Sequence, residues 1–394
     1  MERRVLRTAG APPLFPCLKS GGANLSRERR EKMEINPIIK EVTTDCNLRC
    51  KYCFFAKQER RRNRVSTAML RTIVGKICEC NPDNQEIIFY WHGGEPLLAG
   101  IDFYNQAVEF QQRFKKSGQK IRNAIETNAT LLNSEWADFL SKKGFETGVS
   151  LDGPRKYHNE YRRYPDGRGS FDDVMKGVEV LKNNGIEFRV LAVVNKKSVL
   201  APEEIFKFFS LNEISNSVNL APALGIETGH GLSFECSVEP VSYIDFLIKI
   251  FDFWMKTDKS ELKILPLESI VRAFLGFSQE DCRFAGECRK SIVVEYNGDI
   301  FACNTYGYGD FFKFGNIKNG VEAILDPQKS SKYKNYLDFL RKIKTGCFKC
   351  KWYRICKGGC PGWYYLGGGK NILCQDFKRL FRYIQRNLER YQLI

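Results

Sequence analysis

The stretch CNLRCKYC, residues 46–53, follows a short apolar segment and carries three cysteines, Cys46, Cys50 and Cys53. Their spacing, C-x3-C-x2-C, supplies three thiolate ligands. A cluster of four irons and four sulfides takes four ligands, so this run would leave one iron open to a substrate or cofactor. A fully ligated cluster can only transfer electrons, and the open iron therefore indicates a catalytic site. A zinc site with a distant fourth ligand is the alternative that the spacing alone leaves open.

A second set of cysteines lies toward the C-terminus. Its eight members are Cys282, Cys288, Cys303, Cys347, Cys350, Cys356, Cys360 and Cys374. Eight thiolates suffice for two fully ligated four-iron clusters, and zinc ribbons do not use this order of spacings. The other cysteines follow no pattern; they are Cys17, Cys78, Cys80 and Cys236. Cys78 and Cys80 fall at the end of a predicted helix, where we interpret them as ordinary small residues.

The composition indicates a globular, metal-binding protein. Of the 394 residues 43% are apolar, and no apolar run is long enough to predict a transmembrane helix. The basic N-terminus lacks the continuous apolar core of a signal peptide, so we expect a cytoplasmic protein. Fifteen cysteines in such a chain are better metal ligands than disulfide partners. Three histidines are too few for zinc fingers of mixed Cys and His ligands.

The formal net charge of +16 does not by itself select a partner. A basic surface attracts nucleic acid, acidic peptides and phosphates without choosing among them. The run ERRRNR at 59–64 is most simply a solvated loop, with contact to an acidic partner as the alternative. The charge motivates one non-enzymatic hypothesis, a metal-stabilised nucleic-acid-binding protein. We nevertheless expect no specific nucleic acid partner.

From residue 36 the sequence alternates strand-like and helix-like segments. Strands are expected at 36–43, 86–91, 120–126, 145–151, 186–194 and 216–222. Helices are expected at 66–79, 101–116, 134–143, 171–184 and 202–210, with N-caps at Asn133-Ser134 and Ser170. This rhythm implies parallel strands joined by right-handed crossovers, and six such units form an open partial barrel of the α/β class. Chemistry in such barrels lies on the loops after the strands, where the cysteine triplet stands.

Five segments are expected along the chain. They are a weakly ordered basic extension (1–33), the partial barrel (34–235), a linker of two helices (236–277), an auxiliary-cluster domain (278–375) and a C-terminal helix (376–394). Within the fourth segment, SIVVEYNGDIFACN at 291–304 predicts a β-hairpin with its turn at Asn297 and Gly298.

Two short motifs follow predicted strands. GGEP at 93–96 is by itself a tight turn, but beside a cluster loop its backbone and carboxylate are suited to a cofactor ammonium. GVSLDGP at 148–154 ends the fourth strand. Together with the triplet, these motifs resemble the radical S-adenosylmethionine (SAM) enzymes over about 36–375. The resemblance implies a [4Fe–4S] cluster on the triplet that chelates SAM at its open iron, and a 5′-deoxyadenosyl radical that abstracts hydrogen from carbon.

The resemblance also implies a set of SAM contacts. It comprises Tyr52, Gly93, Gly94, Glu95, Ser150, Asp152, Arg162 and Leu224. Ser150 matches a ribose-side residue, Arg162 the basic residue that pairs with the SAM carboxylate, and Leu224 a position near adenine. Taken one at a time, a strand-end serine, a surface arginine and a core leucine are the simpler interpretations. Their order along six strands favours the SAM interpretation.

The C-terminal cysteines resemble the SPASM extension, most closely that of the anaerobic sulfatase-maturating enzymes. That family holds two auxiliary [4Fe–4S] clusters with interleaved ligands. Carried over to this chain, one cluster takes Cys282, Cys288, Cys303 and Cys360, and the other takes Cys347, Cys350, Cys356 and Cys374. Because the ligands are far apart in the sequence, loss of either cluster should unfold this region.

The resemblance implies that three positions line the substrate pocket, and at all three this chain departs from the sulfatase maturases. Where that family has an aspartate thought to act as base, this chain has Asn304, which cannot accept a proton near neutral pH. His92 replaces the glutamine before GGEP, and Phe55 replaces a tyrosine after the triplet. His92 is the first candidate for substrate contact or base because imidazole titrates in the useful range; a structural histidine is the alternative. Asp310 and Glu227 are weaker catalytic candidates.

We therefore expect an enzyme that crosslinks a ribosomally synthesised precursor peptide through a thioether or carbon–carbon bond. The alternatives are formylglycine formation, as in sulfatase maturation, and dehydrogenation of a small molecule. The expected cofactors are SAM and three [4Fe–4S] clusters. The expected partners are a precursor peptide or protein with an acidic leader and a reductant of the flavodoxin or ferredoxin type. Residues 1–33 are too short and too polar to fold as a leader-recognition domain.

Overall fold

The computed structural model describes residues 34–394 apart from 54, 56–61, 225–233, 258–260 and 305–309. The expected N-terminal extension, Cys17, Glu227 and the first half of the basic run at 59–64 lie outside the described residues. Within the described ranges, none of the helices combines the length and the apolar character that a membrane span requires.

One sheet of ten strands organises the described residues, in the order β10-β9-β8-β1-β2-β3-β4-β5-β6-β7. Its parallel part confirms the six expected strands: β1 (Asn36–Lys40), β2 (Glu86–Trp91), β3 (Lys120–Thr127), β4 (Phe145–Ser150), β5 (Phe188–Val194) and β6 (Ser217–Pro222). A further parallel strand, β7 (Lys263–Leu265), lies inside the segment expected to be helical. The strand is too short to show a hydrophobic period, which is why the sequence pattern missed it.

The C-terminal hairpin joins the same sheet. β8 (Ser291–Glu295) pairs in parallel with β1, β9 (Asp299–Phe301) returns antiparallel, and β10 (Lys313–Asn316) follows. The predicted hairpin is therefore confirmed. Its pairing with β1 was not predicted, because no local pattern encodes a contact between segments so distant in the sequence. This pairing brings the hairpin that leads to Cys303 next to the strand that leads to the triplet.

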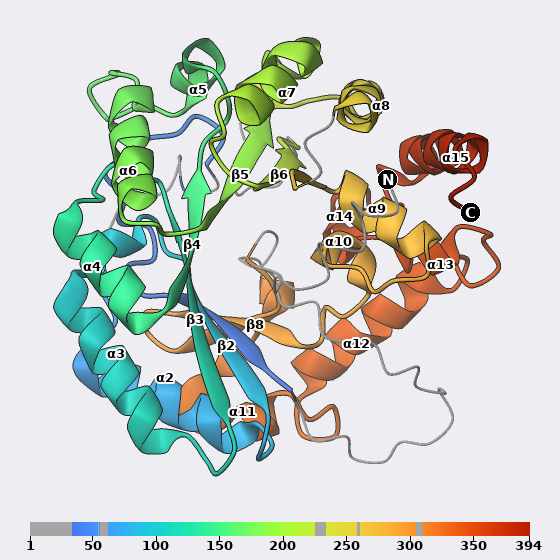
Figure 1. Cartoon of the computed structure of the whole chain (residues 1–394). Helices are drawn as coiled ribbons and strands as arrows, with labels where there is room; N and C mark the ends of the chain where they lie inside the picture. Colours follow the sequence, from blue (N-terminus) through green and yellow to red (C-terminus); the bar gives the residue numbers. More distant parts are fainter. Residues whose placement is uncertain (1–33, 54, 56–61, 225–233, 258–260, 305–309) are drawn as a thin grey trace.

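Helices cover the outer side of the curved sheet (Figure 1). The barrel helices are α2 (Thr67–Cys80), α3 (Ile101–Phe114), α4 (Ser134–Lys143), α6 (Phe171–Asn183) and α7 (Pro202–Leu211), as expected, with an additional short α5 (Arg155–Tyr161). The two expected linker helices are α8 (Pro240–Lys256) and α9 (Leu267–Phe274). The C-terminal part contains α10 (Cys282–Ala285), α11 (Val321–Ile324), α12 (Ser331–Lys344), α13 (Tyr353–Cys356), α14 (Pro361–Leu366) and α15 (Cys374–Arg390).

Both predicted helix N-cap positions are confirmed, but only one of the two side chains makes the capping hydrogen bond. Asn133 caps α4 by accepting a hydrogen bond from the amide of Trp136. Ser170 occupies the N-cap position of α6, but its side chain makes no capping hydrogen bond. Its hydroxyl instead lies 3.0 Å from His158 Nε2 and donates to the Arg162 carbonyl at 3.0 Å. Ser170 therefore ties the start of α6 to the segment that carries Arg162, and this tertiary contact replaces the local one.

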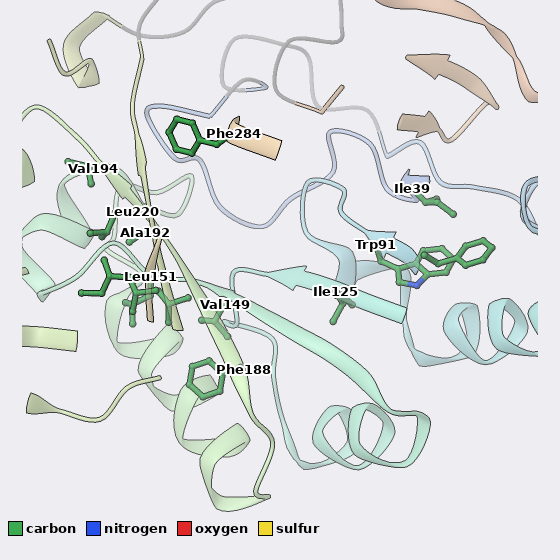
Figure 2. Close-up of a cluster of buried hydrophobic side chains, with 14 of the residues drawn as sticks. Ile39, Trp91, Ile125, Val149, Leu151, Phe188, Ala192, Val194, Leu220 and Phe284 are labelled. Atoms are coloured by element: carbon green, nitrogen blue, oxygen red, sulfur yellow. The ribbon is translucent and has the colours of Figure 1, made fainter. Parts of the chain in front are cut away.

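The two faces of the sheet differ, as the two-residue period of a strand requires. Outward side chains such as Ile39, Trp91, Ile125 and Val149 contribute to the main buried core (Figure 2). A smaller cluster on the inner face comprises Ile38, Ile88, Tyr90, Ala124, Val293 and Phe301. At the carboxyl ends of the strands the inward positions become polar, with Lys40, Glu126, Ser150 and Glu295. The inner face of the sheet is thus apolar along the strands and polar at their carboxyl ends, where the triplet loop begins.

Candidate functional site

The GGEP turn packs against the loop that carries the cysteine triplet. The Glu95 amide donates to the Asp45 carbonyl at 2.9 Å, next to the first cysteine. A Cβ on Gly94 would lie 2.6 Å from the Asp45 carbonyl carbon, and one on Gly93 would lie 2.5 Å from Val42 Cγ2. Only glycine permits so close a backbone approach. The two motifs therefore form one continuous surface.

The Glu95 carboxylate is buried and largely occupied by protein donors. Thr127 Oγ1 donates to Oε1 at 2.6 Å, the Leu97 amide to Oε1 at 3.1 Å and the Asn128 amide to Oε2 at 2.7 Å. Burial raises the pKa of Glu95 to about 7, although these hydrogen bonds oppose the shift. A carboxylate has about four acceptor positions. Glu95 therefore braces the turn and the start of η2 (Pro96–Ala99), and its 0% exposure leaves it enclosed by protein atoms.

Three of the expected SAM contacts, Tyr52, Asp152 and Arg162, form one buried cluster. The Tyr52 hydroxyl and Arg162 Nε both donate to the Asp152 carboxylate, the latter at 3.0 Å. The Arg162 guanidinium carbon also lies 5.4 Å from the centre of the Tyr52 ring. The Arg162 side chain is only 8% exposed, so it is not the surface arginine of the simpler interpretation. A guanidinium has five N–H donors, of which Nε is one.

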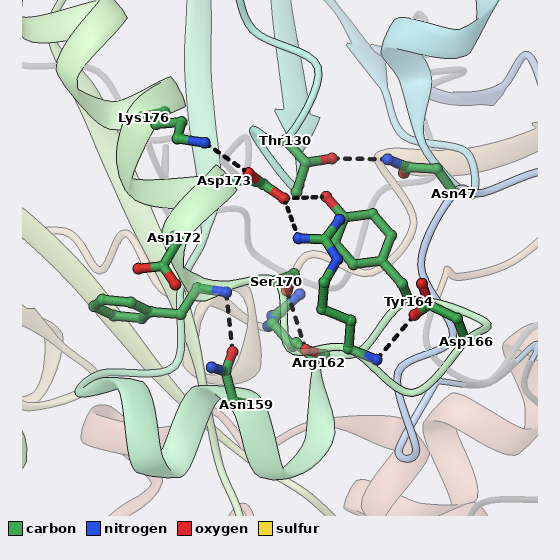
Figure 3. A network of polar contacts seen from close by, with 12 residues as sticks. Asn47, Thr130, Asn159, Arg162, Tyr164, Asp166, Ser170, Asp172, Asp173 and Lys176 are labelled. Atoms are coloured by element: carbon green, nitrogen blue, oxygen red, sulfur yellow. Dashed lines mark hydrogen bonds and ion pairs between the residues drawn. The ribbon is translucent and has the colours of Figure 1, made fainter.

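The triplet loop is held on two sides. On one side, the Arg49 amide donates to the Arg163 carbonyl at 2.6 Å, in the segment after α5. On the other, Asn47 Nδ2 donates to Thr130 Oγ1 at 2.7 Å, in the loop after β3 (Figure 3). Figure 3 also shows Tyr164, whose hydroxyl donates to Asp173 of α6 at 2.9 Å. These contacts give the loop that carries the three cysteines a defined position above the strand ends.

Glu126, on β3, is an inward-facing acid that the sequence motifs did not identify. Ser150 Oγ donates to Glu126 Oε1 at 3.1 Å, and the Tyr90 hydroxyl lies 3.3 Å from Oε2. Burial raises the pKa of Glu126 to about 7. Ser150, expected on the ribose side of SAM, is thus bound to a carboxylate. The signal that would have found Glu126 is a charged residue at an inward strand position, where an apolar one is usual.

Lys40, at the end of β1, is a second inward group that the motifs missed. It is 1% exposed, and its Nζ lies 3.3 Å from His92 Nδ1. The same ring nitrogen lies 3.3 Å from the Gly93 carbonyl oxygen, so the ring tautomer decides which contact is a hydrogen bond. Burial, followed by the charge of Lys40, lowers the pKa of His92 to about 3. This corrects the expectation that His92 titrates near neutral pH, where its ring instead stays uncharged.

The other expected residues lie in different surroundings. Phe55 is buried, and Lys40 Nζ lies 5.4 Å from the centre of its ring. Asn304 is partly buried, and its Oδ1 has no hydrogen-bond partner among the described residues. Leu224 packs partly buried against the main core, whereas Asp310 is exposed at the start of η5 (Asp310–Phe312). Among these four residues, Phe55 is therefore the one that lies beside the Lys40–His92 pair.

One group of C-terminal cysteines is defined by mutual interactions. Desolvation raises the pKa of Cys282, and the charged forms of Asp281, Cys360 and Cys288 add to the shift. Cys288 interacts in turn with Cys303. Because these interactions require proximity, they link the four cysteines expected for one auxiliary cluster.

The second group is equally self-contained. Burial raises the pKa of Cys356 to about 11, and the thiolates of Cys347, Cys350 and Cys374 contribute. Cys374 also interacts with Cys347 and Cys350. Two separate groups of four thiols fit the ligand number of two four-iron clusters. Within the described residues, no three His, Cys, Asp or Glu side chains are placed to hold a single metal ion, and no cysteine forms a disulfide.

Two family models match this chain. Residues 40–209 match the radical SAM superfamily. Residues 282–361 match SPASM, an iron–sulfur cluster-binding domain. The cofactors are therefore SAM and a [4Fe–4S] cluster in the barrel, with two auxiliary clusters in the C-terminal part.

Curated relatives align with most of the chain. The cysteine-type anaerobic sulfatase-maturating enzyme of Clostridium novyi is 31% identical over 359 residues, covering 88% of this chain and 94% of the relative. The serine-type enzyme of Bacteroides thetaiotaomicron is 30% identical over 373 residues, covering 88% of each chain.

Solved structures share the fold. Native anSMEcpe with bound AdoMet gives a TM-score of 0.80 at 28% identity, over 91% of this chain and 99% of that one. The same protein with AdoMet and a Kp18Cys peptide also gives 0.80 at 28% identity, over 91% and 98%. This chain belongs to the radical SAM superfamily and, with its SPASM domain, to the family of the anaerobic sulfatase-maturating enzymes.

Proposed function

We propose that this chain oxidises a side chain of a peptide or protein by two electrons, beginning with hydrogen abstraction from carbon. The observation that carries the proposal is its alignment, over nearly their full length, with sulfatase-maturating enzymes. A solved relative with bound AdoMet and peptide supports a peptide substrate. When bound, SAM supplies the 5′-deoxyadenosyl radical for the abstraction, and the auxiliary clusters, having no open iron, supply electron transfer.

The residues of the barrel would hold and orient SAM. Cys46, Cys50 and Cys53 would ligate the catalytic cluster. The GGEP backbone would receive the SAM ammonium, and Glu95 would hold that backbone in position through its hydrogen bonds. Arg162, fixed through Nε by Asp152, would present its other N–H groups to the SAM carboxylate. Tyr52, Ser150 and Leu224 would complete the site around the cofactor.

The two cysteine groups would ligate the auxiliary clusters. Cys282, Cys288, Cys303 and Cys360 would hold the first auxiliary cluster, and Cys347, Cys350, Cys356 and Cys374 the second. The first set would fasten the end of the β8–β9 hairpin to the segment before α14. Cluster binding would therefore contribute directly to the stability of the C-terminal part.

Formylglycine formation is the first candidate outcome of the oxidation. It is the outcome that the names of the relatives indicate, and their identity of 31% and 30% extends along most of this chain. If formylglycine is the product, a group other than Asn304 accepts the proton released by the substrate, because a side-chain amide is not a base near neutral pH. Uncharged His92 has the protonation state that a base requires, but its lowered pKa makes it a weak one.

A crosslink within the peptide is the second candidate outcome. It is favoured by the three departures at the expected substrate pocket, Asn304, His92 and Phe55. Phe55 has no hydroxyl, and the unpartnered Oδ1 of Asn304 offers a hydrogen-bond acceptor in place of a base. Such a pocket suits a substrate radical that attacks a neighbouring group of the same peptide. Both outcomes remove two hydrogen atoms or their equivalent from the substrate.

The charge distribution supports an acidic segment in the substrate or in the reductant. Residues 331–394 contain fifteen Lys or Arg and only three Asp or Glu. Most of these cations are at least partly exposed on α12, α13, α15 and the loops between them. A face of one sign attracts an oppositely charged partner and accelerates its association. We propose that it receives the acidic leader of a precursor peptide or an acidic flavodoxin- or ferredoxin-type protein.

The test is anaerobic turnover of the reconstituted protein with SAM, dithionite and two substrates. One substrate is a sulfatase-derived peptide, and the other is the product of a small reading frame adjacent to the gene. 5′-Deoxyadenosine formation together with a modified peptide supports the proposal. A hydrazide probe then separates the outcomes, because formylglycine carries an aldehyde and a crosslink does not. Protein that binds clusters but neither cleaves SAM nor changes the mass of either peptide would overturn the proposal.

A matched variant, Asn304→Asp, restores the carboxylate found in the maturases. If the wild-type chain makes a crosslink, the variant should shift part of the product toward an aldehyde. If the wild-type chain already makes the aldehyde, the crosslink reading is wrong, and the variant measures only how much a stronger base accelerates the reaction.

A further inference from the structure

Lys40 combines deep burial with a position between two functional regions. It ends β1, and its register partner on the neighbouring strand β8 is Glu295. It is 1% exposed, with Nζ 3.3 Å from His92 Nδ1 and 5.4 Å from the centre of the Phe55 ring. A buried lysine is costly, because an ammonium loses its hydration. The protein therefore has to provide compensating negative charge.

Part of that compensation comes from cysteines of two different sites. Burial lowers the pKa of Lys40 to about 8. The charged forms of Cys53 and Cys303 oppose this shift, after those of two nearby acids. Cys53 belongs to the triplet, whereas Cys303 belongs to the first auxiliary group. Other buried or partly buried cations act on a cysteine of a single group, for example Arg162 on Cys50 and Lys344 on Cys288. Lys40 thus lies between the two sites, because β8 pairs with β1.

Two nearby carboxyl groups also act on the charge of Lys40. Burial raises the pKa of Glu41 to about 8, so this carboxyl is largely uncharged near neutral pH. Glu295, whose Oε2 accepts a hydrogen bond from Thr43 at 2.8 Å, is the acid whose charge acts most strongly on Lys40. Thiolate-ligated clusters are anionic and become more so on reduction. A positive charge between two of them is attracted more strongly to their reduced forms.

We propose that Lys40 is a positioning residue shared by the catalytic cluster and the first auxiliary cluster, whose charge favours the reduced form of both. This inference rests on the proposed cluster ligands. The group that holds the charge also contacts His92 and Phe55, two of the positions expected to line the substrate pocket. Lys40 therefore connects the pocket electrostatically to both redox centres.

The experiment is a potentiometric titration of the reconstituted holoenzyme, followed by electron paramagnetic resonance. Lys40→Met removes the charge while keeping a flexible apolar chain. We expect lower midpoint potentials for the catalytic and first auxiliary clusters and an unchanged potential for the second auxiliary cluster. The catalytic signal is recognised by its change on adding SAM, and cysteine variants that lack one auxiliary cluster assign the other two.

Two matched variants sharpen the test. Lys40→Arg keeps the charge, so the potentials should remain near those of the wild-type chain. Lys344→Met removes a cation that acts on Cys288, and it should lower the potential of the first auxiliary cluster alone. Potentials that do not move in Lys40→Met, or that move equally for all three clusters, overturn the proposal. An equal shift would indicate a general structural disturbance.

Loss of the catalytic cluster from a Lys40 variant also tests the proposal. If Lys40→Met and the polar Lys40→Gln both lose the catalytic cluster while Lys40→Arg retains it, a requirement for charge is supported at the level of assembly. If Lys40→Arg also loses the catalytic cluster, the site requires the shape of the lysine side chain rather than its charge, and the proposal is wrong. A wild-type chain that binds fewer than three clusters would instead contradict the proposed ligand sets, which separates that failure from this one.

Discussion

Arg162 Nε donates to Asp152 Oδ1 at 3.0 Å, in a pair whose side chains are 8% and 0% exposed. The same carboxylate accepts hydrogen bonds from the Tyr52 hydroxyl and from the Val193 amide, the latter at 3.0 Å. Asp152 therefore connects the triplet loop, the segment after α5 and β5. The position of Arg162, the arginine expected to pair with the SAM carboxylate, depends on this single acid.

Replacing that acid should be strongly destabilising. Asp152→Ala leaves the Arg162 guanidinium buried without its counter-ion, and removing one partner of a buried pair costs about 3–5 kcal/mol. Chemical denaturation followed by circular dichroism measures the loss. The exposed pair of Asp138 and Lys142, with side chains 63% and 73% exposed, supplies the control. Asp138→Ala should change stability by no more than about 0.5 kcal/mol, and an equally small effect of Asp152→Ala would contradict the argument.

The contact between GGEP and the triplet loop leads to a prediction about one cluster. Gly94→Ala would place a methyl carbon 2.6 Å from the Asp45 carbonyl carbon, so the loop has to move. We expect the catalytic cluster to be lost, with about a third of the iron, while both auxiliary clusters remain. Iron analysis and the loss of the SAM-dependent resonance signal measure this. Gly75→Ala, where the nearest atom lies 3.8 Å away, is the control and should retain all the iron. Full iron content in Gly94→Ala would show that the loop tolerates the displacement.

The two cysteine groups should lose iron independently. Cys356→Ala removes a member of the second group, and Cys288→Ala a member of the first. Each variant should lose about a third of the iron and the resonance signal of one auxiliary cluster, leaving the catalytic signal in place. In the double variant the losses should add. If either single substitution removed both auxiliary signals, loss of one cluster would unfold the region that holds the other, as the interleaved ligands imply, and the two sites would not be independent.

Glu126 should make stability depend on pH. Burial raises its pKa from 4.5 to about 7, so the folded chain retains this proton where the unfolded chain releases it. The associated stability is full below pH 4.5 and is lost as the pH rises toward and through 7. Glu126→Gln cannot titrate, so its stability relative to the wild-type chain should improve over that interval by up to about 3 kcal/mol.

Thermal unfolding at a series of pH values checks the Glu126 prediction. Loss of an acceptor for Ser150 and Tyr90 adds an offset that does not vary with pH, so the slope is the relevant quantity. The exposed residue Glu135 on α4 provides the control substitution, Glu135→Gln. Parallel curves for the wild-type chain and Glu126→Gln would show that Glu126 does not hold a proton in the folded state.

The sequence alone was sufficient for the order of the barrel and for the chemistry at its centre. Strand and helix periods located the six parallel strands because burial against helices imposes those periods locally. The triplet indicated an open iron because ligand number follows directly from the count of neighbouring cysteines. The resemblance to SPASM proteins supplied the partition of the eight cysteines. Their mutual interactions in the structure follow the same partition.

Only the tertiary structure decided what surrounds these groups. Thr43 Oγ1 and Glu295 Oε2 lie 2.8 Å apart although the residues are 252 positions apart in the sequence, because β8 pairs with β1. That pairing places Lys40 between the triplet and the first auxiliary group, and burial there keeps His92 uncharged. Hydrophobic period and ligand spacing are properties of neighbouring residues, so the sequence shows them directly. Burial, pKa and the closeness of two metal sites arise only when distant strands meet.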